Sequence, residues 1–349
     1  MVVPIVFLLV FVGLVWFLQQ RSIRTALDGV EYSREVSKIL NAPDEEFTLT
    51  TTITNTKFKL VPFIEVEEEV SRERSNSFRT FLMPRSKYVR RVKGSLPERG
   101  RYLFSRAQIN GGDFLGISQN IKPYRARCEI IIYPREIKCG HLDRMMGSFM
   151  GDISVQRFIA PDPILVMGFS EYTGREPMKA ISWAQTLRSG QMMVKNYDYT
   201  TEPSTTVVLS LDFLTGHQLK LPPESAQLME TCLSIARTVC ETLSNHKIRY
   251  DFFSNISPGD LANTWAYVPE GFGERHLANI LTGLGNAMLF RSETLQQLTQ
   301  RVAKKQMAHK SVLFIVPNQE EKNLQVIRQT AKELKSVRVI AADKTGGAV

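Results

Sequence analysis

Asp212 is the residue best placed for chemistry, because it directly follows the apolar stretch Val207–Leu211. A buried strand that ends in a carboxylate and continues into a polar loop is where open α/β sheets place their ligand sites. Carboxylate oxygens are also typical ligands of Mg²⁺. Asp212 therefore raises the hypothesis of a divalent-metal-dependent adhesion or hydrolytic domain, with His276 or His217 as a further participant.

Other catalytic chemistry finds little support in the residues. The five histidines lie in no motif that pairs them with a nucleophile, and the chain contains no Walker A, dinucleotide-binding, HExxH or G-x-S-x-G pattern. The four cysteines form no CxxC and no zinc spacing. Cys232 and Cys240 fall on the apolar face of an expected helix, which predicts buried free thiols. We expect no enzyme activity and no cofactor.

The region that would position Asp212 has the alternating pattern of an α/β domain. Strands are expected at 207–211, 248–253, 311–316 and 337–341. Helices are expected at 222–243, 274–288, 292–305 and 319–334. This alternation predicts a parallel or mostly parallel sheet over 205–342, followed by a disordered tail at 343–349.

The stretch from Gly168 to Asp212 leads into this sheet and holds most of the distinctive residues. A polar loop at 170–177 precedes a short helix around 181–187, which Gly190 is placed to end. An alternating strand follows from Met193. We assign 138–204 as one segment.

The N-terminal part has a different sequence pattern. Residues 1–20 are almost wholly apolar with Arg21 and Arg24 following, which predicts a transmembrane anchor with the rest of the chain in the cytoplasm, at the cell (inner) membrane. A cleaved signal peptide is the alternative, but no basic residue precedes the apolar run. Residues 21–44 are expected to form a helical connector. Short alternating strands between turns then predict a β-sandwich over 45–137.

Positive charge is concentrated in the expected sandwich, and the whole chain carries a net charge of +9. A solvated strand face is the simplest interpretation. Attraction to anionic membrane lipid is the functional alternative for the basic region 72–106. Nucleic acid is not expected as a partner, because no recognition helix or stacking-aromatic motif accompanies the charge. The cations are Arg72, Arg74, Arg79, Arg85, Lys87, Arg90, Arg91, Lys93, Arg99, Arg101 and Arg106.

A family resemblance rests on the segment G-F-S-E-Y-T-G-R-E-P-M-K-A-I-S-W-A-Q-T-L-R-S-G-Q-M-M-V-K, residues 168–195. It resembles the signature of the domain-of-unknown-function family 58 (DUF58), with matches at Glu171-Tyr172, Ile181, Trp183, Arg188, Gly190 and Val194-Lys195. The upstream R-G-R-Y-L-F, G-G-D-F-L-G and I-I-I-Y-P-R are similar to further elements of that family. The resemblance implies a membrane segment, a β-rich region, a von Willebrand factor A-like domain and association with a MoxR-type AAA+ ATPase.

The chain departs from the family signature at several positions. Ser170 replaces an Arg, Gly174-Arg175-Glu176 replaces Pro-Gly-Asp, Lys179 replaces an Arg and Ser182 replaces an Asn. An Arg-to-Lys exchange loses bidentate hydrogen bonding.

The metal site of von Willebrand A domains is also incomplete in this chain. The family pattern Asp-x-Ser-x-Ser appears as Asp212-Phe213-Leu214-Thr215-Gly216, in which Leu214 and Gly216 replace both hydroxyls. No threonine stands in register near 274–277, and Asn318 stands where a second Asp is expected. Asp212 is thus a vestigial candidate that caps or hydrogen-bonds a local loop.

These observations predict an α+β multidomain fold: an N-terminal transmembrane helix, a β-sandwich domain and an α/β von Willebrand factor A-like (Rossmann-type) domain. The expected function is a membrane-anchored scaffold or adaptor that presents a degenerate von Willebrand A-like domain to a protein partner. The residues expected to take part are Glu171, Tyr172, Glu176, Lys179, Trp183 and Arg188. Of these, Trp183 is expected to be a core anchor beneath the loop.

Overall fold

The computed structural model divides the chain into two compact units, residues 1–133 and 134–349. The described residues are 10–11, 13–17, 27–71, 74–112, 119–157, 166–197, 204–212, 223–256, 266–288, 292–305, 311–331 and 336–345.

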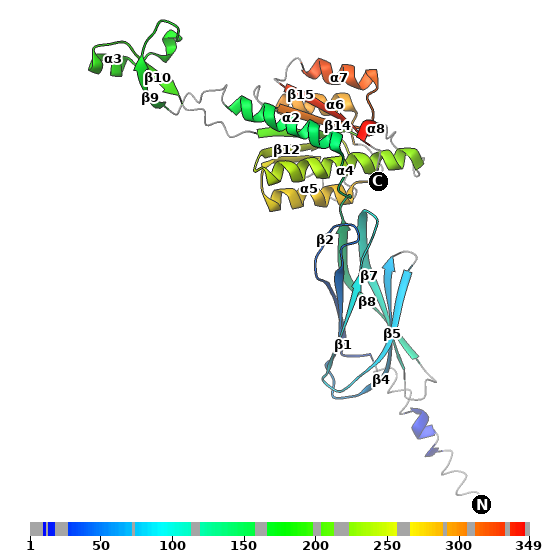
Figure 1. Ribbon diagram of the computed structural model, residues 1–349. Coiled ribbons are helices and arrows are strands. Elements are labelled where there is room, and N and C mark those ends of the chain that lie inside the picture. The colour runs from blue at the N-terminus through cyan, green and yellow to red at the C-terminus, as the bar shows by residue number, and fades with distance from the viewer. Residues whose placement is uncertain are drawn as a thin grey trace, which may run out of the picture. The chain divides into compact units, whose positions relative to one another are not determined.

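Unit 1 is a sandwich of two sheets (Figure 1). The first sheet has the order β1-β3-β6 and the second β2-β8-β7-β4-β5. The strands are β1 (Val30–Val36), β2 (Leu40–Asn41), β3 (Phe47–Asn55), β4 (Val61–Ser71), β5 (Arg74–Leu82), β6 (Lys87–Gly94), β7 (Gly100–Gly112) and β8 (Gln119–Ile132).

Alternation of buried and more exposed positions along the strands forms the sandwich core. In β3 every second residue from Phe47 to Asn55 is buried, and the threonines between them face outward. Two apolar clusters fill the interior, one around Ile53 and Ile64 and the other around Phe104 and Ile130. Burial of these alternate faces holds the two sheets together.

Within unit 1 one carboxylate lies inside this apolar interior. The Glu68 carboxylate accepts hydrogen bonds from Thr51 Oγ1 at 2.6 Å and Tyr32 Oη at 2.9 Å, and pairs with Arg34 at 3.2 Å. The side chains of Arg34 and Glu68 are each 1% exposed. A buried charge requires such partners, because unpaired it would lose its hydration without compensation.

Unit 2 contains a five-stranded sheet in the order β13-β12-β11-β14-β15. Four strands are parallel, and the edge strand β13 is antiparallel to β12. Counted from β11, this is the order 3-2-1-4-5 of a doubly wound sheet. The strands are β11 (Ser204–Leu209), β12 (Arg249–Ser254), β13 (Tyr267–Gly271), β14 (Ser311–Val316) and β15 (Ser336–Ala341).

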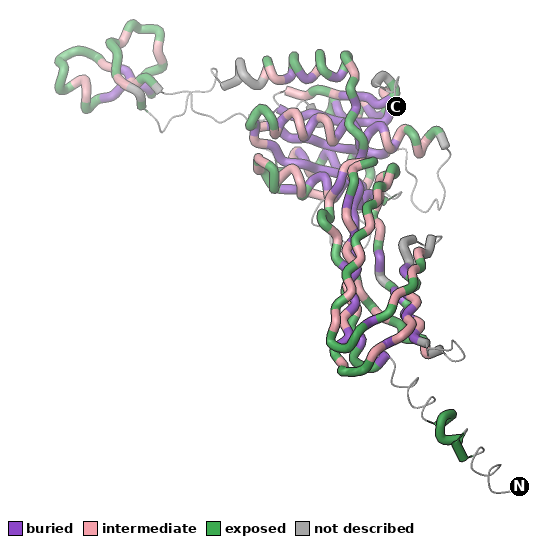
Figure 2. Tube along the Cα trace, turned by 60° about the horizontal axis from the view of Figure 1, so that its bottom comes forward, coloured by how far each residue is buried: buried purple, intermediate pink, exposed green. Residues whose placement is uncertain are grey.

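Helices cover both faces of this sheet. Alternate residues of β14 face opposite sides: Val312, Phe314 and Val316 share a buried cluster with residues of α6 and α7. Leu313 faces the other side, where α2 contributes to a shared pocket. The helices are α2 (Gly140–Arg157), α4 (Pro223–Asn245), α5 (Glu274–Asn286), α6 (Leu295–Lys305), α7 (Glu321–Ala331) and α8 (Ala342–Thr345). Figure 2 shows the strands of the sheet as a nearly continuous buried layer.

The predicted fold class is wrong in its N-terminal part. A continuous apolar helix of about 20 residues is needed to span a bilayer. Across the part of the chain that the structure describes, no helix is long and apolar enough for this. Of residues 1–20, where we predicted the transmembrane helix, only 10–11 and 13–17 belong to the described part.

Three further sequence expectations need correction. The helical connector expected at 21–44 contains β1 and β2 instead, because Val30, Tyr32, Arg34 and Val36 alternate with exposed residues in register with β3. The tail expected to be disordered from 343 is helical to Thr345, and 346–349 lie outside the described residues. Both α2 and β13 were missed.

Candidate functional site

The stretch from β9 (Val166–Glu171) to β10 (Met193–Tyr197), here called the signature module, has a local fold of its own. β9 and β10 form an antiparallel pair, and the 3-10 turn η1 (Met178–Ala180) and helix α3 (Trp183–Ser189) lie between them in sequence. The buried apolar residues of the module are Ala180, Ile181 and Val194. This core is small for a stretch of this length.

One backbone hydrogen bond and one bond to a threonine hydroxyl fix α3 against β10. Ser182 N donates to Met193 O at 2.8 Å, and Met193 N donates to Thr186 Oγ1 at 3.0 Å. The helix ends where sequence analysis predicted, at Gly190, which adopts the left-handed conformation with φ 74°. A residue with a Cβ would be strained there.

The loop after β9 is ordered by one carboxylate. Glu176 accepts a hydrogen bond from Thr173 N at 3.0 Å and another from Thr173 Oγ1 at 2.8 Å. These bonds stabilise the charged form, so the side-chain hydrogen bond from Thr173 and backbone hydrogen bonds lower the pKa of Glu176. Glu176 therefore serves the loop itself.

The other predicted site residues of the module are mostly exposed. Trp183 is 64% exposed and Leu187 is 85% exposed, one helical turn apart on α3. Met178, on η1, is 72% exposed. The expectation that Trp183 is a core anchor is thus wrong, because the module buries Ile181 and Val194 in its place. Glu171, Lys179 and Arg188 are exposed, and Tyr172 is partly buried.

The second candidate region is the carboxyl end of β11. Asn255, after β12, is completely buried there. Its Oδ1 accepts a hydrogen bond from Leu211 N at 2.9 Å, and its Nδ2 donates to Ser210 Oγ and to the Glu293 carbonyl, both at 3.3 Å. Ser292 N donates to its carbonyl at 2.7 Å. Asn255 thus joins the ends of two strands to the segment before α6.

Asp212 joins the same network. Its Oδ1 accepts a hydrogen bond from the N–H of Leu295, the first residue of α6, at 3.2 Å. Carboxylates are favourable at this position, because the first N–H groups of a helix have no partner within the helix. The local hydrogen-bonding role expected of Asp212 is therefore present.

Arg301 of α6 completes the network. Its guanidinium donates to the carbonyl oxygens of Ala266 and Ser254, both at 3.1 Å, and pairs with Glu293. It also lies over the ring of Phe253, 5.4 Å from the centroid. Sequence analysis missed both Asn255 and Arg301, because each acts through contacts distant in sequence and belongs to no motif.

The structure does not bring Asp212 and His276 together. His276 packs edge-on against Tyr250, 4.7 Å between centroids, and burial lowers its pKa. Tyr250 lies near the start of β12, beside the start of β11, whereas Asp212 follows the end of β11. His276 and Asp212 thus lie at opposite ends of the parallel strands. His217 lies outside the described residues, and within the described part no three His, Cys, Asp or Glu side chains are grouped as metal ligands.

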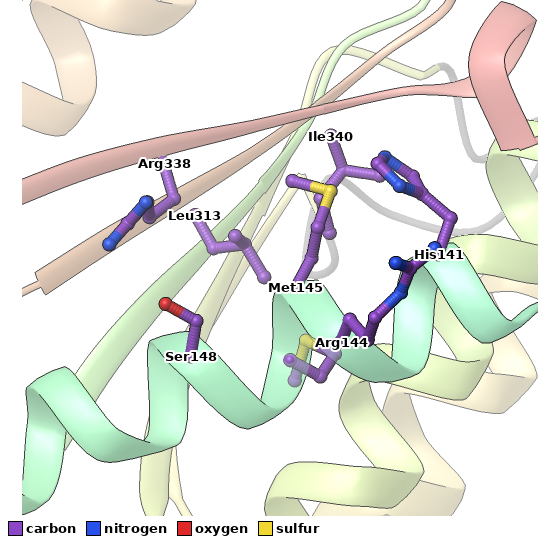
Figure 3. A pocket seen from close by; sticks show the side chains of 8 residues that line it. His141, Arg144, Met145, Ser148, Leu313, Arg338 and Ile340 are labelled. Atoms are coloured by element: carbon purple, nitrogen blue, oxygen red, sulfur yellow. The ribbon is translucent and has the colours of Figure 1, made fainter.

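A pocket of about 320 Å³ lies between α2 and the strands β14 and β15 (Figure 3). Leu313, Ile340 and Met146 give it an apolar lining, and His141 and Arg144 stand at the α2 side. Arg338 also lines it, but its guanidinium pairs with Asp152 at 2.6 Å. This ion pair joins the α2 side of the pocket to β15.

Cys232 and Cys240 are buried free thiols, as predicted from the pattern of α4. Burial raises the pKa of each thiol well above its usual value. Neither is suited to nucleophilic chemistry, which requires the thiolate.

Comparison with protein-family models and with curated protein sequences finds no match. Among solved structures, a CARDB domain from Pyrococcus furiosus, solved with di-metal ions, shares 12% identity at a TM-score of 0.24, covering 30% of this chain and 94% of that one. The sporulation control protein Spo0M from Bacillus subtilis shares 12% identity at a TM-score of 0.17, covering 29% of this chain and 49% of that one. Likenesses this weak carry no argument about function.

Proposed function

We propose that the chain is a non-enzymatic scaffold or adaptor that binds a protein partner through the signature module. The partner implied by the resemblance to DUF58 is a MoxR-type AAA+ ATPase. In this proposal the five-stranded domain is a von Willebrand A-like domain whose metal site is degenerate. Its doubly wound strand order is compatible with that assignment.

The observation that carries the proposal is the exposure of large apolar side chains on the signature module. Trp183, Leu187 and Met178 are exposed on a module that is well ordered by its own backbone hydrogen bonds. Neighbouring exposed apolar side chains, such as Trp183 and Leu187 one turn apart on α3, are typical of an interaction surface, whereas single ones are common on any protein. Tryptophan in particular is enriched among residues that dominate binding energy.

Charge around this surface supports a protein partner. Glu171, Lys179 and Arg188 are exposed near the apolar residues in sequence. An apolar centre with charges of both signs around it is the usual composition of a protein interface. The network at the end of β11 is, by contrast, occupied with hydrogen bonds inside the fold.

The proposal is tested by capture of a purified MoxR-type AAA+ ATPase on the immobilised full chain, with ATP, with ADP and without nucleotide. We expect binding in at least one nucleotide state, and loss of that binding when Trp183→Ser and Leu187→Ser are combined. Absence of binding in all three states would refute the ATPase as partner. Binding that the double variant retains would refute the assigned surface.

A further inference from the structure

One end of the sandwich carries a compact cluster of cations and exposed apolar side chains. Two loops, 56–60 and 83–86, form it together with β8 next to them. We call this surface the lysine tip. Its residues are Lys57, Phe58, Lys59, Met83, Arg85 and Lys122.

The two loops are fixed to each other by hydrogen bonds. Arg85 N donates to Lys57 O at 2.8 Å. The buried Asn55 side chain donates to the carbonyl oxygens of Lys59 and Met83, both at 2.9 Å. The lysine tip is therefore one preformed surface.

Large apolar groups of the tip face solvent. Phe58 is 75% exposed and Met83 is 55% exposed. The Arg85 guanidinium stacks 3.6 Å from the centroid of the Phe58 ring, so a cation and an aromatic group share one position. Beside Lys122, Ile121 is 59% exposed.

The lysines of the tip are close enough to repel one another. Partial burial lowers the pKa of Lys57 first, and the positive charges of Lys59 and Lys122 lower it further. The carboxylate of Asp28 acts in the opposite direction. Among the described residues, the charges that act on Lys57 are two lysines and one carboxylate, and this local excess of positive charge favours an anionic partner.

The chain enters the sandwich at this same end. Leu27 packs in the core cluster with Val61 and Leu82, and Thr56 N donates to Gly29 O at 2.9 Å. Trp16 and Phe17, 64% and 57% exposed, precede Leu27 by eleven and ten residues. That length of chain reaches at most about 35 Å, so a second exposed apolar stretch is tethered near the tip.

We infer that the lysine tip is a binding surface for an anionic lipid bilayer. Its cations contact headgroup phosphates, and Phe58 and Met83 enter the boundary between headgroups and acyl chains. An exposed aromatic and a methionine between lysines suit such a boundary, which is anionic outside and apolar beneath. This binding surface goes beyond the proposed function and differs from the basic region 72–106, of whose cations only Arg85 belongs to the tip.

Flotation of the full chain with vesicles tests whether the cations of the lysine tip bind anionic lipid. The triple variant Lys57→Gln/Lys59→Gln/Lys122→Gln is compared with a matched triple variant on exposed strand positions away from the two loops, Arg91→Gln/Arg106→Gln/Arg127→Gln. Each cation near the surface contributes about fivefold in partitioning, so the tip variant should bind vesicles with phosphatidylglycerol about a hundredfold more weakly. The matched variant should change by less than about fivefold.

Two results of this experiment would overturn the inference. Equal loss in the two triple variants would show a general charge effect. Equal binding of the unmodified chain to purely phosphatidylcholine vesicles would remove the requirement for anionic lipid.

An environment-sensitive NBD label tests whether the apolar side chains of the lysine tip enter the bilayer. It is placed at Phe58→Cys in a Cys139→Ser background, and at Ile39→Cys as a control, since Ile39 is also exposed but follows the far end of β1. We expect NBD fluorescence to rise on anionic vesicles only for the label at position 58. An equal rise in fluorescence at both positions would contradict insertion of Phe58. Displacement of the vesicles by single-stranded RNA would assign the lysine tip to nucleic-acid binding.

Discussion

Polar and aromatic side chains serve opposite purposes at the end of β11 and in the signature module. At the end of β11, Asn255, Asp212 and Arg301 are occupied by hydrogen bonds to backbone groups of neighbouring segments. In the module, Trp183 and Leu187 point their apolar surface to solvent while Ile181 and Val194 form the core. The first region resembles a ligand site in position but is used for stability.

This difference indicates how the two regions respond to substitution. Polar groups whose hydrogen bonds are made inside the fold contribute to the free energy of folding and have few donors or acceptors left for a ligand. Exposed groups contribute little to folding and can contribute most of the energy of binding. Substitutions in the two regions should therefore separate stability from partner binding.

The largest effect on stability is expected from Asn255→Leu. The substitution leaves the buried Leu211 N–H without an acceptor and removes two further hydrogen bonds. We expect the free energy of unfolding to fall by about 3 kcal/mol. Urea denaturation followed by circular dichroism measures it. Asn196→Leu, at an exposed position in the signature module, should change it by less than about 0.5 kcal/mol, and equal losses in the two variants would remove the distinction between the regions.

Arg301→Met should have the next largest effect. The ion pair with Glu293 and two bonds to carbonyl oxygens disappear, but the Arg301 side chain is 28% exposed, so solvent compensates in part. A loss of about 2 kcal/mol is expected. Arg188→Met in the module serves as the matched control with no expected change. A stability loss in Arg188→Met as large as in Arg301→Met would show that the module also depends on its charges for folding.

Asp212→Asn should have a smaller effect. The amide oxygen still accepts the hydrogen bond from Leu295, but the favourable charge at the start of α6 is lost. The expected loss is about 0.5–1 kcal/mol. The same variant also tests the metal hypothesis. If Mg²⁺ or Mn²⁺ raises the melting temperature of the unmodified chain but not that of Asp212→Asn, the purely structural role of Asp212 is contradicted.

The combined variant Trp183→Ser and Leu187→Ser should leave the melting temperature unchanged within about 2 °C, because neither side chain is buried. Differential scanning fluorimetry measures this. The matched core variant Val194→Ser, at a position 2% exposed, should by contrast disturb the module. A large loss in the surface variant would return Trp183 to the structural role predicted from the sequence.

The smallest effect concerns the loop after β9. Thr173→Val removes the hydroxyl that donates to Glu176, so the pKa of Glu176 should rise toward its usual value. A carboxyl group whose pKa is lower in the folded than in the unfolded state stabilises the fold at pH values above its unfolded-state pKa. This stabilisation is lost as the pH falls through its folded-state pKa. Carboxyl-carbon NMR titration of the two proteins gives the shift. An unchanged pKa would show that the backbone bonds alone order the loop.

Local pattern was enough to predict much of the architecture. The alternation in β3, the helical spacing in α4 and the left-handed stop at Gly190 depend on residues close in sequence, and each element is present. The pattern was ambiguous at β1, where alternating residues were mistaken for a helical connector. The expected transmembrane helix rested on the apolar length of residues 1–20 and on the basic residues Arg21 and Arg24 that follow it.

The functional surface was harder to predict. A tryptophan is compatible with both a core and an interface, and only the arrangement of Ile181 and Val194 decides which side chain the module buries. Asn255 and Arg301 carried no signal, because each has partners distant in sequence: Glu293 is 38 residues from Asn255, and Ser254 is 47 residues from Arg301. The role of Asp212 required the position of Leu295, 83 residues away.

The central claim is that binding of a protein partner belongs to the signature module and not to the end of β11. It is tested most directly by the dissociation constant for a purified MoxR-type AAA+ ATPase, measured by biolayer interferometry with two variants of the full chain. The combined variant Trp183→Ser and Leu187→Ser should weaken binding at least about thirtyfold, as expected for interface anchors. Asp212→Asn should leave the dissociation constant unchanged. Unchanged affinity in the double variant together with lost affinity in Asp212→Asn would contradict the account.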